Sequence, residues 1–215
     1  MQSRITAALA ICALAMFAHP ILADDAPAAL TPKQAAESFC RAMENGDIAG
    51  AKALAVGSDK QLAVLETIVP FVHAFKQLEN SAFKKWGEAG RNELTASPGG
   101  AARFDVYDRI KTDREEINGD SATLTTTDPK ATDRSPMKLK KVNGQWKMDL
   151  ASVQDEGMDD PKNVKIFKSM AEIAKTTASE IDQGKYPDAA SAKQAMGQKI
   201  LAAMGVAGVP AEVKK

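Results

Sequence analysis

The sequence predicts an α+β domain in which N-terminal helices cover an antiparallel sheet, followed by a two-helix extension. Between residues 136 and 150, apolar and charged residues alternate on both sides of an Asn-Gly pair, the pattern of a β-hairpin. Between residues 31 and 87, apolar residues recur at helical spacing. One face of the hairpin is apolar, so we expect these helices to cover it.

The first 23 residues have the features of a signal peptide. Arg4 precedes an uncharged apolar run over residues 5–18, and small residues lead up to Ala23. We therefore expect cleavage after Ala23 and export to the periplasm or the medium. Cleavage after Ala28 also meets the small-residue rule, but it places two aspartates ahead of the cleaved bond. The run is too short for a membrane span and no later segment is apolar enough, so we expect none.

Composition excludes several classes of partner and bond. The 215 residues include 28 basic and 28 acidic ones, and loss of Arg4 with the leader leaves 27 basic residues against 28 acidic ones. This near-neutral balance indicates no nucleic-acid partner. One cysteine, Cys40, and one histidine, His73, remain, so an intramolecular disulfide cannot form. We expect one α+β domain over residues 24–155 and a helical extension with its tail over residues 156–215.

Capping residues define the N-terminal helices. Thr31, followed by a proline and Gln34, predicts a capping box, and Gly46 predicts the end of this first helix. Asp47 begins a second, shorter helix that we expect to continue through Ala55 to Gly57. Ser58 and Gln61 form another capping box, from which a long helix runs to about Gly87. Pro70 lies inside that helix, where we expect a kink or a break.

Strand patterns begin after residue 110. Residues 101–110 fit a helix, which we favour, although Phe104 and Val106 would also suit the start of a strand. From Arg114 the period becomes two, with strands predicted at 115–117 and 121–127 around an Asn-Gly turn. The hairpin of residues 136–150 completes the sheet.

The extension is predicted to contain two helices, one from Asp160 to Gly184 and one from Asp188 to Gly205. The apolar face of the first consists of Val164, Phe167, Met170, Ile173, Ala174 and Ile181. That of the second consists of Met196, Ile200, Leu201 and Met204. Two short helices need a third surface to cover such faces, and we expect the preceding domain to provide it.

Two motifs resemble those of secreted NTF2-like domains. The first is Ala36-x-x-Phe39-x-x-Ala42-x-x-x-Gly46-Asp47-x-x-x-Ala51-x-x-Leu54, and the second is Leu139-x-x-Val142-Asn143-Gly144-Gln145-Trp146-Lys147 preceded by Asn118–Leu124. The chain is most similar to the exported, lumazine-binding-like bacterial branch over residues 31–151. The resemblance implies a cone of helices packed on a curved sheet (a cystatin-like fold). It does not imply one activity, because this superfamily includes enzymes, binding proteins and scaffolds.

Acid–base chemistry has few candidates. Enzymes of the superfamily place such groups inside the cone, and here His73, Asp105, Tyr107 and Asp108 are the weak catalytic candidates. Their spacing does not bring any two of them together, and the first helix has no tyrosine. Cys40 with His73 would be a nucleophile and its base, but Cys40 follows Phe39 on an apolar stripe, which favours a buried small hydrophobe.

Other kinds of site are weaker still. The acidic stretch 155–160 lacks the alternating ligands of a calcium loop, and we expect neither a metal nor a cofactor. Lysines 138, 140, 141 and 147 form a basic face that fits edge protection better than phosphate binding. If the cone is open, the residues expected to line it are Phe39, Met43, Val72, Leu124 and Trp146.

The function expected from these features is a non-catalytic small-ligand-binding or accessory module of the bacterial envelope. Its ligand would be a small apolar or amphipathic molecule. Two alternatives stay open: an isomerase- or dehydratase-type enzyme using polar groups in the cone, and an interaction scaffold acting through the C-terminal helices. A homodimer is compatible with the sequence, and the sequence does not fix the oligomeric state.

Overall fold

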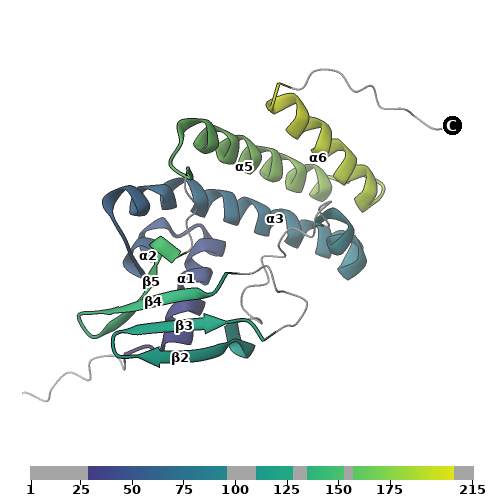
Figure 1. Ribbon diagram of the computed structural model, residues 1–215. Coiled ribbons are helices and arrows are strands. Elements are labelled where there is room, and N and C mark those ends of the chain that lie inside the picture. The colour runs from purple at the N-terminus through teal and green to yellow at the C-terminus, as the bar shows by residue number, and fades with distance from the viewer. Residues whose placement is uncertain (1–28, 96–109, 128–134, 153–156, 206–215) are drawn as a thin grey trace, which may run out of the picture.

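The computed structural model describes residues 29–95, 110–127, 135–152 and 157–205. It confirms the α+β class: a sheet with α1 and α2 lies on one side of the long helix α3, and α5 and α6 lie on the other (Figure 1). The helices are α1 (Pro32–Asn45), α2 (Ile48–Ala53), α3 (Asp59–Thr95), the 3-10 turn η1 (Leu150–Ser152), α5 (Pro161–Asp182) and α6 (Ala189–Ala203). The strands are β1 (Ala55–Val56), β2 (Arg114–Asn118), β3 (Ser121–Thr125), β4 (Met137–Val142) and β5 (Gln145–Asp149).

The central hairpin is confirmed in position and register. β4 and β5 pair antiparallel, with Leu139 opposite Met148 and Lys141 opposite Trp146. Asn143 and Gly144 both have positive φ, 51° and 80°, as a type I′ turn requires. β3 pairs antiparallel with β4, and β2 with β3, giving the order β1-β5-β4-β3-β2.

The prediction of a purely antiparallel sheet is wrong at one edge. The second helix ends at Ala53, and Ala55–Val56 forms a short strand parallel to β5. The backbone N–H of Met148 donates to the carbonyl of Leu54 at 2.8 Å, which holds this segment extended beside the sheet. The sheet is therefore mixed, and Ala55 is a strand residue instead of a helical one.

The predicted helix starts are confirmed. Thr31 and Gln34 form the capping box of α1, and Gly46 ends that helix at a φ of 74°. Ser58 and Gln61 bond reciprocally at the start of α3. Asp160 and Asp188 cap α5 and α6 by accepting hydrogen bonds from backbone N–H groups.

Helix α3 runs through Pro70, so of the predicted kink or break there the break is wrong, while the kink stays a prediction. The non-helical residue inside α3 is Gly87, with φ 69° and ψ −163°. Pro70 cannot bond the carbonyl of Glu66, but Glu66 is exposed, so water can satisfy that group. Gly87 adopts a conformation that is essentially restricted to glycine, and the chain changes direction at that residue.

Two hydrophobic cores share α3. The first lies between the sheet, α1 and the N-terminal half of α3, where Leu65 and Val69 are buried with Leu139 and Met148. The second lies between α3, α5 and α6, where Ala74 and Leu78 are buried with neighbouring helix residues. The ring of Phe71 packs on that of Phe75 within α3 at a centroid distance of 4.8 Å and on that of Phe167 in α5 at 5.3 Å.

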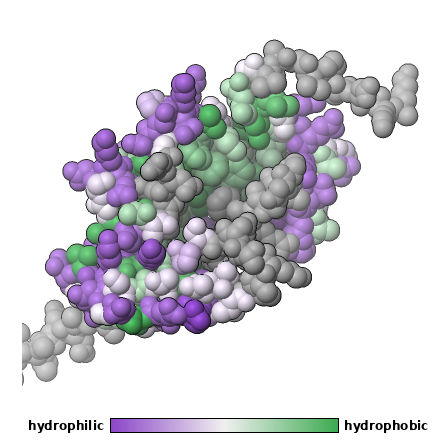
Figure 2. Space-filling model, viewed as in Figure 1, coloured by the Kyte–Doolittle hydropathy of each residue, from purple (hydrophilic) through white to green (hydrophobic). Residues whose placement is uncertain are grey.

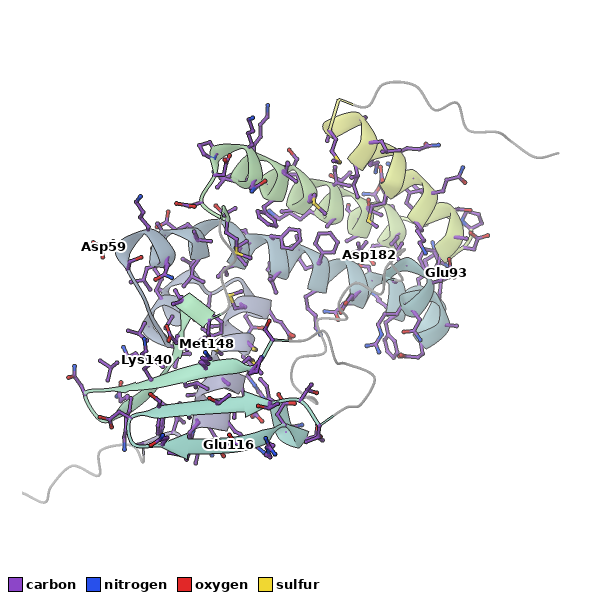
Figure 3. All side chains as sticks on the ribbon, in the orientation of Figure 1. Asp59, Glu93, Glu116, Lys140, Met148 and Asp182 are labelled. Atoms are coloured by element: carbon purple, nitrogen blue, oxygen red, sulfur yellow. The ribbon has the colours of Figure 1, made fainter. Side chains whose placement is uncertain are left out.

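The expectation that the extension packs on its own domain is confirmed, and the covering surface is α3. Small residues make this contact close, with Ala171, Ala174 and Ala178 of α5 buried against α3. Polar groups fix the C-terminal end of α5: the Ser81 hydroxyl donates to Asp182 at 3.1 Å, and the Lys85 amine donates to the carbonyl of Ile181 at 3.1 Å (Asp182 is labelled in Figure 3). Within the described residues, every helix is too short or too polar to cross a lipid bilayer.

Candidate functional site

An apolar cleft lies between α5 and α6. Its volume is about 250 Å³. Its apolar walls are made by Ile166, Met170, Ile173, Ile200, Ala203 and Met204. Figure 2 shows hydrophobic residues gathered on the side of the molecule that α5 and α6 form, between hydrophilic surfaces. Because Ile166 and Met204 are 39% and 58% exposed, the cleft is open to solvent.

The cleft exists because α5 has two apolar stripes instead of one. The stripe toward α3 contains Ala171, Ala174, Ala178 and Ile181, all buried. The second stripe contains Ile166, Met170 and Ile173, which face the cleft. The predicted single apolar face of this helix contains Met170 and Ile173 but not Ile166. Helical spacing of Ile166, Met170 and Ile173 was the signal that could have revealed the second stripe.

The C-terminal half of α6 is less covered than predicted. Its N-terminal half contributes Ala192 to the second core, whereas Leu201 and Met204 are exposed. The predicted apolar face of α6 is thus covered at one end and open at the other. Its open end forms one wall of the cleft.

The polar lining of the cleft consists of hydrogen-bond donors on one edge of α5. Lys162, Lys165 and Ser169 lie at i, i+3 and i+7, while no carboxylate lines the cleft among the described residues. In that part of the chain, neither lysine amine has an ion-pair partner. The cleft is therefore apolar along its walls and positively charged at one end.

The residues expected to line a cone lie instead in or against packed regions. Phe39, Leu124 and Trp146 belong to the first core, and Met43 packs against it. Val72 is also buried. Of these five, Trp146 also borders a cleft of about 330 Å³ that it shares with Leu30 and Leu54 at the edge of the sheet.

His73 has a structural environment. Its Nδ1 lies 2.6 Å from the backbone carbonyl of Glu44, which can only accept, so Nδ1 carries the proton. Nε2 then accepts from the side-chain amide of Gln77 at 2.9 Å. The ring also packs on Gly46, where an added Cβ would lie 3.2 Å from Cγ of His73. His73 thus satisfies a carbonyl at the end of α1 and contributes to the α1–α3 contact.

Besides His73, the catalytic candidates are three other residues and Cys40. Asp105, Tyr107 and Asp108 lie outside the described residues. Cys40 is half-buried and packs against the first core, as expected of a small hydrophobe. Among the described residues, the ring nitrogens of His73 bond to Glu44 and Gln77 and not to Cys40. The structure therefore does not form the pair of a Cys40 nucleophile and a His73 base.

The basic face of the hairpin is partly neutralised. Lys140 pairs with Asp149 at 2.9 Å, and the amine of Lys141 lies 5.6 Å from the ring centre of Trp146 (Lys140 is labelled in Figure 3). Lys141 is opposite Trp146 in the ladder, so it lies on the same face of the sheet as Trp146 and not on the outer side, and it is exposed. Lys138 and Lys147 remain on the outer side, which fits edge protection.

A second polar cluster joins α5 to α6. Glu180 accepts from the hydroxyl of Tyr186 at 2.5 Å and from the amine of Lys199. The hydrogen bond from Lys199, followed by that from Tyr186, lowers the pKa of Glu180 to about 2. Burial, together with the hydrogen bond to Glu180, raises the pKa of the Tyr186 phenol. Glu180 therefore stays ionised and the Tyr186 phenol stays protonated near neutral pH. Together with Lys199 they hold α5 and α6 together, but they make a poor acid–base pair.

No group of three or more His, Cys, Asp or Glu side chains in the described ranges is arranged to hold a metal ion. No protein-family model matches the chain, and comparisons with curated proteins and with solved structures also give no match. The cleft between α5 and α6 is the feature whose shape and chemistry best fit a ligand site.

Proposed function

We propose that this protein is a non-catalytic small-ligand-binding module of the bacterial envelope, and that its ligand occupies the cleft between α5 and α6. The observation that supports this proposal is the cleft itself, with six apolar wall residues and two lysines at one end. Ligand sites combine apolar walls with a few polar groups in this way. The proposal moves the expected ligand from the cone to the extension, because four of the five expected cone residues are buried and Met43 packs against the first core.

We further propose an NTF2-like frame and an exported location for this module. The frame is supported by the order of α1, α2 and α3 before the strands β2–β5 and by the Asn-Gly hairpin. Export is supported by Arg4 and the apolar run of residues 5–18. Protein recovered from its host should begin at Asp24, or otherwise at Ala29, and an intact Met1 would contradict export.

Native mass spectrometry of the full chain purified from its host's envelope tests the ligand proposal. We expect a bound small molecule on the wild-type protein. Ala203→Trp places a large ring in the cleft, so this variant should lose the ligand. Ala202→Trp is the matched control, because Ala202 is exposed on the same helix and does not line the cleft. Wild-type protein without a ligand, or equal retention by both variants, would contradict the proposal.

A second candidate function is an interaction scaffold. The exposed apolar side chains Ile166, Leu201 and Met204 on α5 and α6 favour it. On this hypothesis the wild-type protein self-associates or holds a partner through that face. Met204→Asp would then abolish the association in sedimentation velocity. A wild-type protein that remains monomeric and ligand-bound would exclude the scaffold hypothesis.

A further inference from the structure

We propose that the cleft between α5 and α6 binds a single-chain amphiphile with an anionic head group, such as a medium-chain carboxylate. This inference rests on the proposed function and specifies the class of its ligand. The chain of the amphiphile would lie on the apolar walls, and its head group would lie at Lys162 and Lys165.

The size of the cleft selects one short chain. Its volume of about 250 Å³ is just below the range of roughly 300–1,000 Å³ that encloses drug-sized ligands. A two-chain lipid would therefore leave most of its surface outside. From Lys165 to Ile173 the cleft follows α5 for roughly 12 Å, at a rise of about 1.5 Å per residue. A linear alkyl chain lying along the helix fits that shape.

The charge of the cleft selects the head group. A lysine amine has three donors and no acceptor, so two lysines favour a group that only accepts. Ser169 adds a hydroxyl on the same edge of α5. Since no acidic residue lines the cleft in the described part of the chain, a carboxylate or sulfate would meet attraction without a competing internal partner. A cationic or zwitterionic head group would lack this match.

The aliphatic parts of the Lys162 and Lys165 side chains also support this placement of the amphiphile along α5. Lysine side chains lie along apolar surfaces while their amines stay in water. Lys162 and Lys165 are at the N-terminal end of the row whose apolar members are Ile166, Met170 and Ile173. The order along α5 is therefore cationic first and apolar afterwards, which matches the two parts of an anionic amphiphile.

Isothermal titration of the full chain with decanoate and with 1-decanol, each below its aggregation concentration, tests the inference. These probes share one chain and differ in charge. We expect Lys162→Gln with Lys165→Gln to weaken decanoate binding about tenfold, as two exposed ion pairs would, and to change decanol binding less than about twofold. Added salt should weaken decanoate binding to the wild-type protein but not to the double variant, which lacks the two lysines.

A charge-matched control is available on the same helix. Lys168→Gln with Lys175→Gln removes the same charge from α5, but neither residue lines the cleft. We expect decanoate binding to this control to match the wild-type protein. Equal weakening in both double variants would show a general effect of net charge and would overturn the inference.

The failures of the two proposals can be told apart. If decanoate and decanol bind equally well to both wild-type and variant protein, the anionic head group is wrong while the ligand module stands. If neither binds, and the protein from its host carries no ligand, the proposed function fails as well.

Other occupants of the cleft give distinct results. Dimerisation that decanoate does not reverse would assign the cleft to a second copy. Val209→Asp places a charge in the C-terminal tail, which should expel the tail from an apolar cleft. If decanoate binds this variant but not the wild-type protein, the tail is the occupant. Sedimentation with phosphatidylglycerol vesicles in the absence of decanoate binding would assign it to a membrane surface. Each of these three results overturns the inference.

Discussion

Replacement of Glu180 by glutamine should make the stability of the protein less dependent on pH. The pKa of Glu180 falls from 4.5 to about 2 on folding, mainly because Lys199 and Tyr186 donate to it. Since folding depresses this pKa, the stabilisation is complete above about pH 4.5 and is lost as the pH falls toward 2. At about 1.4 kcal/mol for each pKa unit, the upper limit is about 3.5 kcal/mol. Lys199 is 32% exposed, so screening by water reduces the expected value to about 1–2 kcal/mol.

Urea unfolding at pH 7 and pH 3 measures this contribution. We expect Glu180→Gln to be about 1–2 kcal/mol less stable than the wild-type protein at pH 7, and the difference to fall below half of that at pH 3. Glu172→Gln is the control, because Glu172 lies on the same helix, pairs with Lys175 and is exposed, so its loss should change stability little at either pH. A difference for Glu180→Gln that is equal at the two pH values would refute the role of the ionised Glu180.

Three further changes test the cores and the backbone. Trp146 is 7% exposed, so Trp146→Ala should cost about 3–5 kcal/mol; unfolding at the wild-type midpoint would mean that its burial is wrongly assigned. Cys40 packs against the first core, so a thiol reagent should label the native protein far more slowly than the unfolded chain; equal rates would restore the nucleophile hypothesis. Gly87→Ala should destabilise by about 1–3 kcal/mol through backbone strain at its φ of 69°. A steric clash would not contribute, because nothing lies within 4 Å of the added Cβ. Gly197→Ala, at a similarly open site in α6, should instead stabilise by about 0.5–1 kcal/mol, and the same sign for both would refute the strain.

Features determined by neighbouring residues could be predicted from the sequence. Thr31 and Gln34 form their capping box within one turn, and Asn143 and Gly144 form their turn from two residues. Each depends on local backbone preferences, which the chain reveals without knowledge of its fold. The alternation that places Trp146 on the covered face is local in the same sense.

Features determined by distant partners could not be predicted. The strand Ala55–Val56 exists because β5 lies beside it, nearly a hundred residues further along the chain. Likewise, Pro70 is accommodated because Glu66, whose carbonyl loses its helical donor, is exposed on α3. Periodicity showed that α5 is apolar, but it could not show that α3 covers one stripe while Ile166 remains at an open cleft. The candidate site therefore came from tertiary packing, which local pattern does not fix.

Because α3 belongs to both cores, damage to the contact between α3 and α5 should destabilise the sheet as well. Ala174 is fully buried in that contact, and Ala174→Leu should cost about 1–3 kcal/mol through overpacking. In a Trp86→Phe background, the fluorescence of Trp146 reports on the first core alone, while circular dichroism reports on all helices. We expect both signals to shift together to lower urea. Thr176→Leu is the control, because Thr176 is exposed on the same helix. If circular dichroism shifts and Trp146 fluorescence does not, the extension unfolds independently and α3 does not couple the two cores.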